Sequence, residues 1–472
     1  MKVVLHGFGT FPVFFYHLIQ YSKQCNVDIE WSILLSTPHF QDIFEELIGA
    51  NNVRVLDTRI SEANKQCIVI DDVLYPEKLF EDIAAEKRPT LNASASDLEN
   101  KAKWMFHQAQ AFMREMEADV ALVSQVEGMD GKTFIRSAQS LGIETAVPTG
   151  LRNVGGIYFS PDEFESFPSY ANDGAESWRF QAAEFIKQFN QKPTPAWSVS
   201  CEPGEATLDT LRKPLVKRIM NFMKYALSDG SNFKLDKVRA AFLNNMPMLR
   251  NTIWRLNTQH NSRLCNINTA HDLPKKFIFF PLQYTPESSI NTPAAYFLDQ
   301  MRAVDAIRFN MPSDYTLVVK EHPACIETRG GGLLNKLLKT PGVRVAKYDL
   351  NTAEICAQAD LVVSVTGTVV MEAFILGRPS MALGKALPSE VIGGVTGISE
   401  IAQKLSLLLL SEYSISEEEK VSSLSRVFNI QTKAVFTGPG IPGEPALKQS
   451  NIERFYEGFV EHCRRRGINS GR

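Results

Sequence analysis

Short apolar runs alternate with amphipathic stretches over the first part of the chain. Apolar positions recur at helical spacing from residue 11 to residue 25. A Ser96-Asp-Leu-Glu99 capping box predicts a helix that begins at Ser96. Strand-like runs lie at residues 2–5, 29–35, 53–56 and 120–124. Because strands separated by helices favour parallel pairing, we expect a Rossmann-like, doubly wound α/β domain over residues 1–165.

The same alternation returns in the second half. Short continuous apolar runs, typical of strands covered on both faces, lie at residues 277–282, 315–319, 343–346, 361–365 and 380–383. Helical patterns such as 296–309 and 352–359 separate most of them. We expect a second Rossmann-like domain over residues 273–400. A C-terminal helical segment should follow over residues 401–472, ending in a helix at 451–466.

The intervening region, residues 166–272, is expected to be a mostly helical insertion or interdomain layer. Its first half is rich in proline, and residues 212–226 form a basic amphipathic stretch. Such a stretch suits contact with anionic lipid. We favour the simpler interpretation, a helix packed on the protein body with solvated lysines.

Composition excludes several classes of protein. Fifty basic and fifty-three acidic side chains give a formal net charge of -3, which argues against a nucleic-acid-coating protein. The seven cysteines include no CxxC pair, which suits a reducing compartment and offers no zinc site. No apolar run approaches the ~20 residues of a membrane span. We therefore expect a cytoplasmic protein, and association with the cytoplasmic face of a membrane stays open.

The most informative motif is the strand-turn-helix pattern at residues 361–373. The strand ends in Thr366-Gly367-Thr368 and a helix follows at once. Backbone N–H groups at such a start can bind an anion, and Gly367 lets a phosphate approach closely. Glu372 stands one turn into the helix, where a carboxylate can accept hydrogen bonds from ribose hydroxyls. The alternative is a well-capped connection without a ligand.

A second motif, Val-Val-Lys320-Glu-His322-Pro323, ends an apolar strand with charged residues. Ligands of open α/β sheets bind beyond the carboxyl ends of the strands. There His322 and Lys320 could meet a phosphate, and His322 could donate a proton to a leaving group. The alternative is a partly buried histidine bonded to a loop carbonyl.

Polar residues after two other strands complete the candidates. Gln283, Glu287 and Ser288 follow the first strand of the second domain and could line the same cleft, or form a proline-stiffened loop. In the first domain, we expect Glu127 and Asp130 to stand on a glycine-bearing loop at the carboxyl end of the strand at 120–124. Either could act as a base or nucleophile, or could simply complement a helix N-terminus.

Other chemistry is not indicated. The Gly7–Thr10 turn lacks the third glycine of a dinucleotide fingerprint, and Gly131-Lys132-Thr133 lacks the leading glycine of a Walker loop. The aspartates do not form a DxD pattern, so no metal ion is implied. The acidic run at residues 160–163 could border the cleft.

Together these motifs resemble the bacterial capsule and surface-polysaccharide biosynthesis proteins, glycosyltransferases with two Rossmann domains (GT-B type). The resemblance rests on segments 280–287, 320–323 and 364–373, and on Glu127-Gly-x-Asp130. It implies that His322-Pro323 and the hydroxyls of Ser364, Thr366 and Thr368 hold the phosphate of a CMP-sugar, as in transferases of Kdo and sialic-acid type. Glu127 or Asp130 would be the acid of the other domain.

The resemblance implies a metal-independent transferase with no cofactor beyond its nucleotide-sugar donor. A surface polysaccharide or glycolipid would be the acceptor, and peripheral membrane contact is compatible with it. Three alternatives stay open: a UDP-sugar 2-epimerase-like isomerase, a CDP-polyol phosphotransferase, and a non-catalytic polysaccharide assembly protein.

Overall fold

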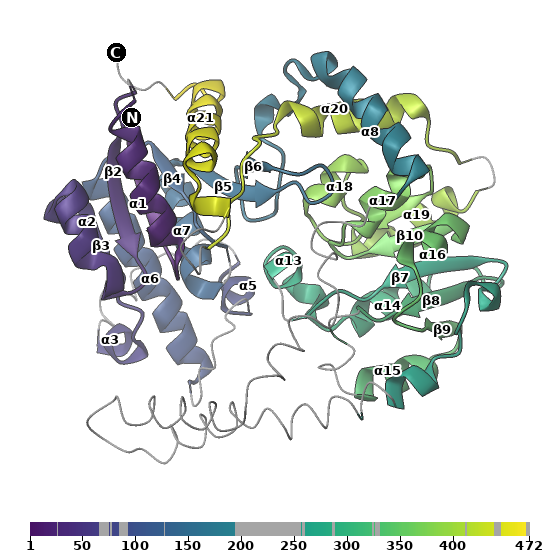
Figure 1. The fold of residues 1–472 in the computed structure, drawn as a ribbon. Helices are drawn as coiled ribbons and strands as arrows, with labels where there is room; N and C mark the ends of the chain where they lie inside the picture. Colours follow the sequence, from purple (N-terminus) through teal and green to yellow (C-terminus); the bar gives the residue numbers. More distant parts are fainter. Residues whose placement is uncertain are drawn as a thin grey trace, which may run out of the picture.

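The computed structural model shows two α/β lobes side by side (Figure 1). It describes residues 1–25, 27–65, 75, 78–84, 93–126, 128–193, 256, 260–285, 288–322, 325, 331–410, 413–438 and 445–468. The basic stretch at 212–226 lies outside the described residues.

The first lobe contains a six-stranded sheet in the order β3-β2-β1-β4-β5-β6. Its strands are β1 (Lys2–Gly7), β2 (Glu30–Leu35), β3 (Val53–Val55), β4 (Val120–Leu122), β5 (Glu144–Gly150) and β6 (Ile157–Ser160). All pairs are parallel except β5 with β6. The sequence did not predict β5 and β6, because β5 contains Pro148 and β6 is only four residues long.

Alternate residues of these strands supply two cores. Val3 and Leu5 pack with α1 (Phe11–Ser22) on one face of the sheet. Val4 packs with α6 (Ala95–Glu115) and α7 (Gly128–Ser140) on the other. The remaining helices of this lobe are α2 (Gln41–Ile48), α3 (Ile60–Lys65) and α5 (Leu79–Ala84).

The predicted start of α6, at Ser96, is one residue late. The capping box is formed by Ser94 and Asp97 rather than by Ser96 and Glu99. The Asp97 amide donates to the Ser94 hydroxyl, and the Asp97 carboxylate accepts from the Ser94 amide. Both pairs fit the same sequence rule, and the Ser94 box lengthens the helix by one residue at its start.

The second lobe contains a five-stranded parallel sheet in the order β11-β10-β7-β8-β9. Its strands are β7 (Phe277–Pro281), β8 (Thr316–Lys320), β9 (Val343–Ala346), β10 (Leu361–Ser364) and β11 (Ser380–Ala382). All five predicted strands are present, within a residue of the expected bounds. Both sheets reverse strand order beside their first strand, as doubly wound folds do, and the predicted fold class is confirmed.

The helices of the second lobe cover both faces of its sheet. They are α13 (Ser288–Asn291), α14 (Met301–Arg308), α15 (Gly331–Leu338), α16 (Thr352–Gln358), α17 (Val369–Ile375), α18 (Leu387–Val391) and α19 (Ile401–Leu408). The helix predicted at 296–309 is divided, because a short 3-10 turn (Ala295–Leu298) leaves helical geometry before α14 begins.

The chain crosses between the lobes twice over its described length. After β6, α8 (Arg179–Gln191) packs on α20 (Glu417–Asn429) beside the second lobe (Figure 1). Beyond α20, Thr432 pairs with Ile157 of β6, and α21 (Gln449–Arg465) then packs against α1. The predicted final helix is therefore part of the first lobe's core.

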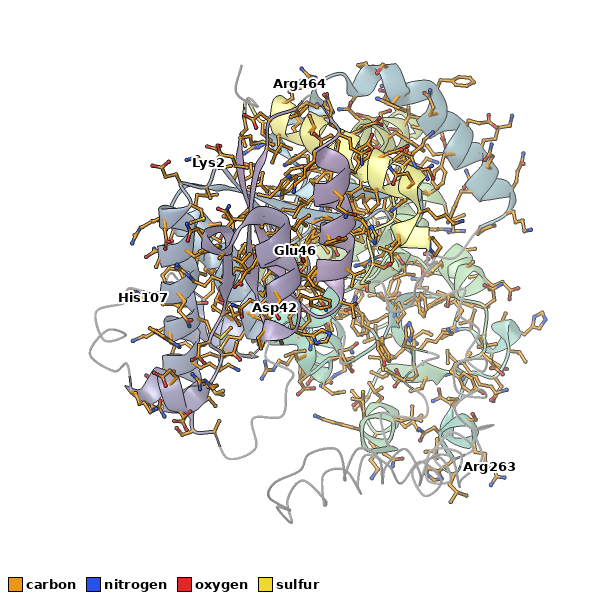
Figure 2. All side chains as sticks on the ribbon, turned by 60° about the vertical axis from the view of Figure 1, so that its left-hand side comes forward. Lys2, Asp42, Glu46, His107, Arg263 and Arg464 are labelled. Atoms are coloured by element: carbon orange, nitrogen blue, oxygen red, sulfur yellow. The ribbon has the colours of Figure 1, made fainter. Side chains whose placement is uncertain are left out.

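Side chains fill the layers between helices and sheets in both lobes, and the charged Lys2, Glu46 and Arg464 lie on the outside (Figure 2). Within the described ranges, every helix is too short or too polar to cross a bilayer.

Candidate functional site

The predicted nucleotide-binding residues lie at one edge of the second sheet. Parallel strands β10, β7 and β8 are neighbours, so their carboxyl ends meet at the same edge. Gln283 follows β7, His322 follows β8, and the Thr366–Thr368 turn follows β10.

Gln283 binds the Thr366–Gly367 turn directly. With its amide oxygen toward the turn, Gln283 accepts the backbone N–H groups of Thr366 (2.8 Å) and Gly367 (2.5 Å). Its amide nitrogen donates to the Thr366 hydroxyl (3.0 Å). A carbonyl oxygen thus takes the position at which the turn could receive an anionic oxygen.

Close packing explains why residue 367 is glycine. A Cβ atom there would stand 2.7 Å from the Ser364 hydroxyl oxygen, which accepts from the Gly367 amide. Ser364 is fully buried and Thr366 is 1% exposed. These two hydroxyls can reach a ligand only if the Gln283 side chain moves.

Glu372 contacts both its own turn and the first lobe. Its carboxylate accepts from the Thr368 hydroxyl (3.3 Å) and from the Asn153 side-chain amide (3.3 Å). Asn153 lies in the loop between β5 and β6. The carboxylate predicted to meet a ribose therefore stands at the junction of the two lobes.

Lys320 is a buried cation at the end of β8. It is 4% exposed, and its ammonium donates to the Thr352 hydroxyl of α16 (3.0 Å). Burial lowers the pKa of Lys320 to about 8, against smaller opposing effects of Cys356, Asp349 and Glu321. An anion bound nearby would favour its protonated form.

His322 lies just beyond the carboxyl end of β8, at the same edge of the sheet. Its ring lies 5.8 Å from that of Tyr284, centroid to centroid, and its backbone N–H donates to the Glu321 carboxylate (2.8 Å). Since Gln283 binds the turn and Tyr284 contacts His322, the end of β7 links the two predicted motifs. Pro323 and Glu287 lie outside the described residues, as does the side chain of Ser288.

In the first lobe, Asp130 does not stand on a loop as expected. It lies in the first turn of α7 and is fully buried. The helix begins at Gly128, because the apolar stripe that includes Met129 and Phe134 must face the sheet. Glu127 lies outside the described residues.

A cavity of about 180 Å³ lies at the carboxyl ends of β4 and β5 and reaches the second lobe at Pro293. Its polar lining includes Ser124, Gln125, Thr149, Asp162, Glu163 and Glu165. The acidic run at 160–163 therefore does border an opening between the lobes. Sequence reasoning missed Glu165, although it extends the acidic run after β6.

This cavity lies close to the Thr366 turn. A Cβ atom at Gly384 would touch both Ala294 (2.8 Å) and Thr366 (2.9 Å), and Ala294 follows the cavity residue Pro293. The next residue, Lys385, forms an ion pair with Asp162 (3.5 Å). Residues 384–385 thus connect the acidic lining of the first lobe with the turn of the second.

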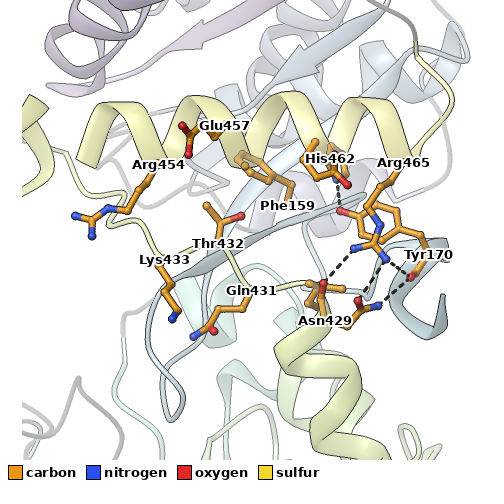
Figure 3. Close-up of a pocket in the computed structure, with 13 residues that line it drawn as sticks. Phe159, Tyr170, Asn429, Gln431, Thr432, Lys433, Arg454, Glu457, His462 and Arg465 are labelled. Carbon is orange, nitrogen blue, oxygen red and sulfur yellow. Dashed lines mark hydrogen bonds between the residues drawn. The ribbon is translucent and has the colours of Figure 1, made fainter. Parts of the chain in front are cut away.

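A second cavity, of about 420 Å³, lies between α21, β6 and residues 429–433 (Figure 3). Its Arg465 donates to the backbone carbonyls of Tyr170, Asp173 and Asn429, and the Tyr170 hydroxyl bonds to His462. These hydrogen bonds hold α21 against residues 170–173 and Asn429. We interpret this cavity as part of the structural junction rather than as the reaction site.

Two solved structures share distant similarity with this chain. The Methanocaldococcus jannaschii UDP-GlcNAc 2-epimerase, in complex with UDP-GlcNAc and UDP, shares 14% identity over 91% of this chain and 99% of its own, at a TM-score of 0.25. The Thermosulfurimonas dismutans KpsC β-Kdo 2,4 transferase shares 11% identity over 65% of this chain and 79% of its own, at a TM-score of 0.30. No curated protein sequence matches the chain.

The sequence model of one family matches the part of the chain that carries the second-lobe motifs. The match covers residues 235–401, about a third of the chain, and the family is described as capsule polysaccharide biosynthesis protein. It includes the segments after β7, β8 and β10 on which the resemblance was based. The resemblance to the capsule polysaccharide biosynthesis proteins is therefore confirmed over residues 235–401.

Proposed function

We propose that this protein is a GT-B-type glycosyltransferase that moves a sugar from a nucleotide-sugar donor to a surface-polysaccharide or glycolipid acceptor. The observation that carries the proposal is the placement of one polar sheet edge of the second lobe beside an acid-lined cavity of the first. The family match over residues 235–401 supports capsule polysaccharide synthesis as the setting.

The second lobe would hold the nucleotide. Gln283 already shows that the Thr366 and Gly367 amides can bind an oxygen together. A donor phosphate would replace that oxygen, with Ser364, Thr366 and Thr368 contributing hydroxyls. Glu372 would accept hydrogen bonds from the ribose.

Lys320, His322 and the adjoining Pro323 would form the phosphate end of this site. Two cationic groups at the strand end would offset the charge that develops on the departing phosphate, the kind of fixed electrostatics that dominates such reactions. With side chains in this role, transfer would be metal-independent, and EDTA should not slow it. By the resemblance, a CMP-linked sugar is the donor to try first. Gln283, Glu287 and Ser288 would border the donor.

The first lobe would present the acceptor. Its cavity at the ends of β4 and β5 opens toward the second lobe, and polar side chains suited to sugar hydroxyls line it. Glu127 and Asp130 remain proposed acids of this lobe. A glycolipid acceptor would bring the protein to a membrane surface, which flotation with vesicles carrying that acceptor would test.

A transfer assay tests the proposal. Wild-type protein is incubated with CMP-, UDP- and GDP-sugars and CDP-glycerol, with and without polysaccharide or glycolipid acceptor, and products are identified by mass spectrometry. We expect an acceptor-dependent glycoside and a loss of about 10²-fold or more in His322→Ala. An epimerised nucleotide sugar without acceptor, a transferred glycerol phosphate, or no turnover with any donor would contradict it.

A further inference from the structure

Part of the lining of the cavity between the lobes is aromatic. Phe11, the first residue of α1, and Phe436, from the segment between α20 and α21, both line it. Their ring centroids lie 4.8 Å apart, and both residues are partly exposed. Phe436 also stacks on Phe455 of α21 (5.2 Å) and meets Phe14 edge-on (5.1 Å). Because the core holds Phe436 in place, the pair offers a preformed apolar surface.

A polar side chain with unused hydrogen-bonding groups lines the same cavity. Gln125 follows β4 and is partly exposed. Its side-chain amide forms no hydrogen bond to the described part of the chain. An amide can both donate and accept. The cavity therefore combines apolar carbon with a group that can exchange hydrogen bonds with a ligand in both directions.

The charge of the lining has one sign. Asp162 and Glu165 line the cavity with side chains that are 19% and 15% exposed, and no Lys, Arg or His is among the described lining residues. Their cationic partners belong to other positions: Lys385 pairs with Asp162 (3.5 Å) and Arg152 with Glu165 (2.7 Å). An anionic ligand would thus meet carboxylates, and like charges repel. A neutral ligand avoids this cost.

The size of the cavity adds a further constraint. Drug-sized ligands usually occupy pockets of about 300–1,000 Å³. A cavity of about 180 Å³ suits a single ring. A pyranose carries C–H groups on its faces and hydroxyls around its edge, so it can pack on phenylalanine and hydrogen-bond at the same time.

We propose that this cavity binds one neutral sugar ring of the acceptor, with its C–H face on Phe11 and its hydroxyls hydrogen-bonded to Gln125. This inference rests on the proposed function and narrows the acceptor to one with an uncharged pyranose at the point of transfer. The ring would belong to a polysaccharide end or to a glycolipid headgroup, which share this chemistry.

Titration of the full chain with methyl glycosides, followed by saturation-transfer NMR, tests the site directly. The neutral probes are the methyl glycosides of glucose, galactose and N-acetylglucosamine. The matched acidic probes are those of glucuronic and galacturonic acid. We expect at least one neutral glycoside to bind at least about tenfold more tightly than either acidic one. Absence of binding by every neutral probe, or equal binding of an acidic one, would overturn the proposal.

Substitutions in the lining test which groups hold the sugar. Phe11→Leu removes the ring and keeps an apolar side chain, so affinity for the neutral glycoside should fall about three- to tenfold. Phe11→Tyr keeps the ring and should stay within about twofold of wild type. Gln125→Met keeps the length and removes the hydrogen bonds, so it should lose about threefold or more.

Phe8→Leu is the matched control. Phe8 is a partly exposed phenylalanine of the turn between β1 and α1, outside the lining of this cavity. Its substitution should leave glycoside affinity within about twofold of wild type. Thermal midpoints show that each variant is folded. Equal glycoside affinity in Phe11→Leu, Gln125→Met and Phe8→Leu would overturn the proposal.

The transfer assay separates this inference from the proposed function. Phe11→Leu and Gln125→Met should raise the acceptor KM about threefold or more and leave the nucleotide Kd within about twofold. The polysaccharide and glycolipid acceptors of that assay show which of the two carries the ring. Transfer with an unchanged acceptor KM in both variants would overturn the inference and leave the transferase intact. A wild-type protein that transfers no sugar would overturn the proposed function, and the glycoside titration would still decide whether the cavity binds sugar.

Discussion

With its side-chain amide oxygen oriented toward the turn, Gln283 accepts the backbone N–H of Gly367 at 2.5 Å. It joins the ends of two neighbouring strands across the edge where ligands of doubly wound folds bind. In the free protein the turn is therefore satisfied from within, and a phosphate must compete with a neutral amide.

Changing that amide to a carboxylate should prevent a phosphate from binding at the turn. In Gln283→Glu, an anionic oxygen faces the Thr366 and Gly367 amides, binds them more strongly and repels a phosphate. We expect nucleotide affinity to fall by about tenfold or more, measured by calorimetry. Gln283→Ala opens the turn and serves as the control. If Gln283→Glu binds nucleotide as tightly as Gln283→Ala, the turn does not receive the phosphate.

Nucleotide binding should be linked to proton uptake at Lys320. Burial lowers the pKa of Lys320 to about 8, so above that pH the free protein has largely lost this proton. A bound phosphate favours the protonated form and raises the pKa again. Affinity should therefore fall as pH rises above about 8, by up to about tenfold per pH unit.

Calorimetry at pH 9 in buffers of different ionisation enthalpy measures this uptake. Lys320→Met should abolish most of it. Uptake that persists unchanged in Lys320→Met would mean that another group takes up the proton.

Gly458 lets α21 pack closely against the segment that contains Thr432. A Cβ atom at this position would collide with the side chain of Thr432, which is bridged to β6. Gly458→Ala should thus destabilise the protein by about 1–3 kcal/mol, although alanine favours a helix. Urea unfolding measures the change. Thr432→Ala in the same chain should recover part of the loss, and simple additivity of the two changes would argue against this contact.

Stability should decline below neutral pH because of His462. Burial, helped by Arg466 and Arg465, lowers the pKa of His462 to about 3, whereas an unfolded histidine titrates near 6.5. Between these values the unfolded state binds more protons. Folding stability from this group is complete above about pH 6.5 and is lost as pH falls, by up to about 1.4 kcal/mol per pH unit.

Urea unfolding between pH 7 and pH 5 shows the effect. His462→Gln should flatten the slope, and His39→Gln, at an exposed position, should not. Identical slopes in His462→Gln and wild type would assign the pH dependence to other groups.

Prediction from sequence was most accurate where a residue's role is local. The apolar runs of β7 to β11 are buried on both faces, so hydropathy alone locates them. The Ser96 box failed because Ser94-x-x-Asp97 satisfies the same local rule and starts the helix slightly earlier. A loop was predicted at Asp130 because Gly128 and Gly131 flank it. The segment is in fact the first turn of α7, whose apolar stripe begins there.

The site depends on contacts that no local pattern encodes. Arg136 pairs with both Asp82 and Glu163, which lie far apart in the chain, and Lys385 of the other lobe pairs with Asp162. The sequence marks 160–163 as acidic without showing which cations pair with each carboxylate, because those partners come from distant segments.

The proposed transfer requires one nucleotide site shared by the Thr366 turn and His322. Calorimetric titration of wild type and His322→Ala with CMP, CDP, UDP and GDP tests it most directly. We expect one of the four to bind wild type with one site per chain and to lose about tenfold or more in affinity in His322→Ala. Absence of binding by all four, or equal binding by His322→Ala, would contradict it.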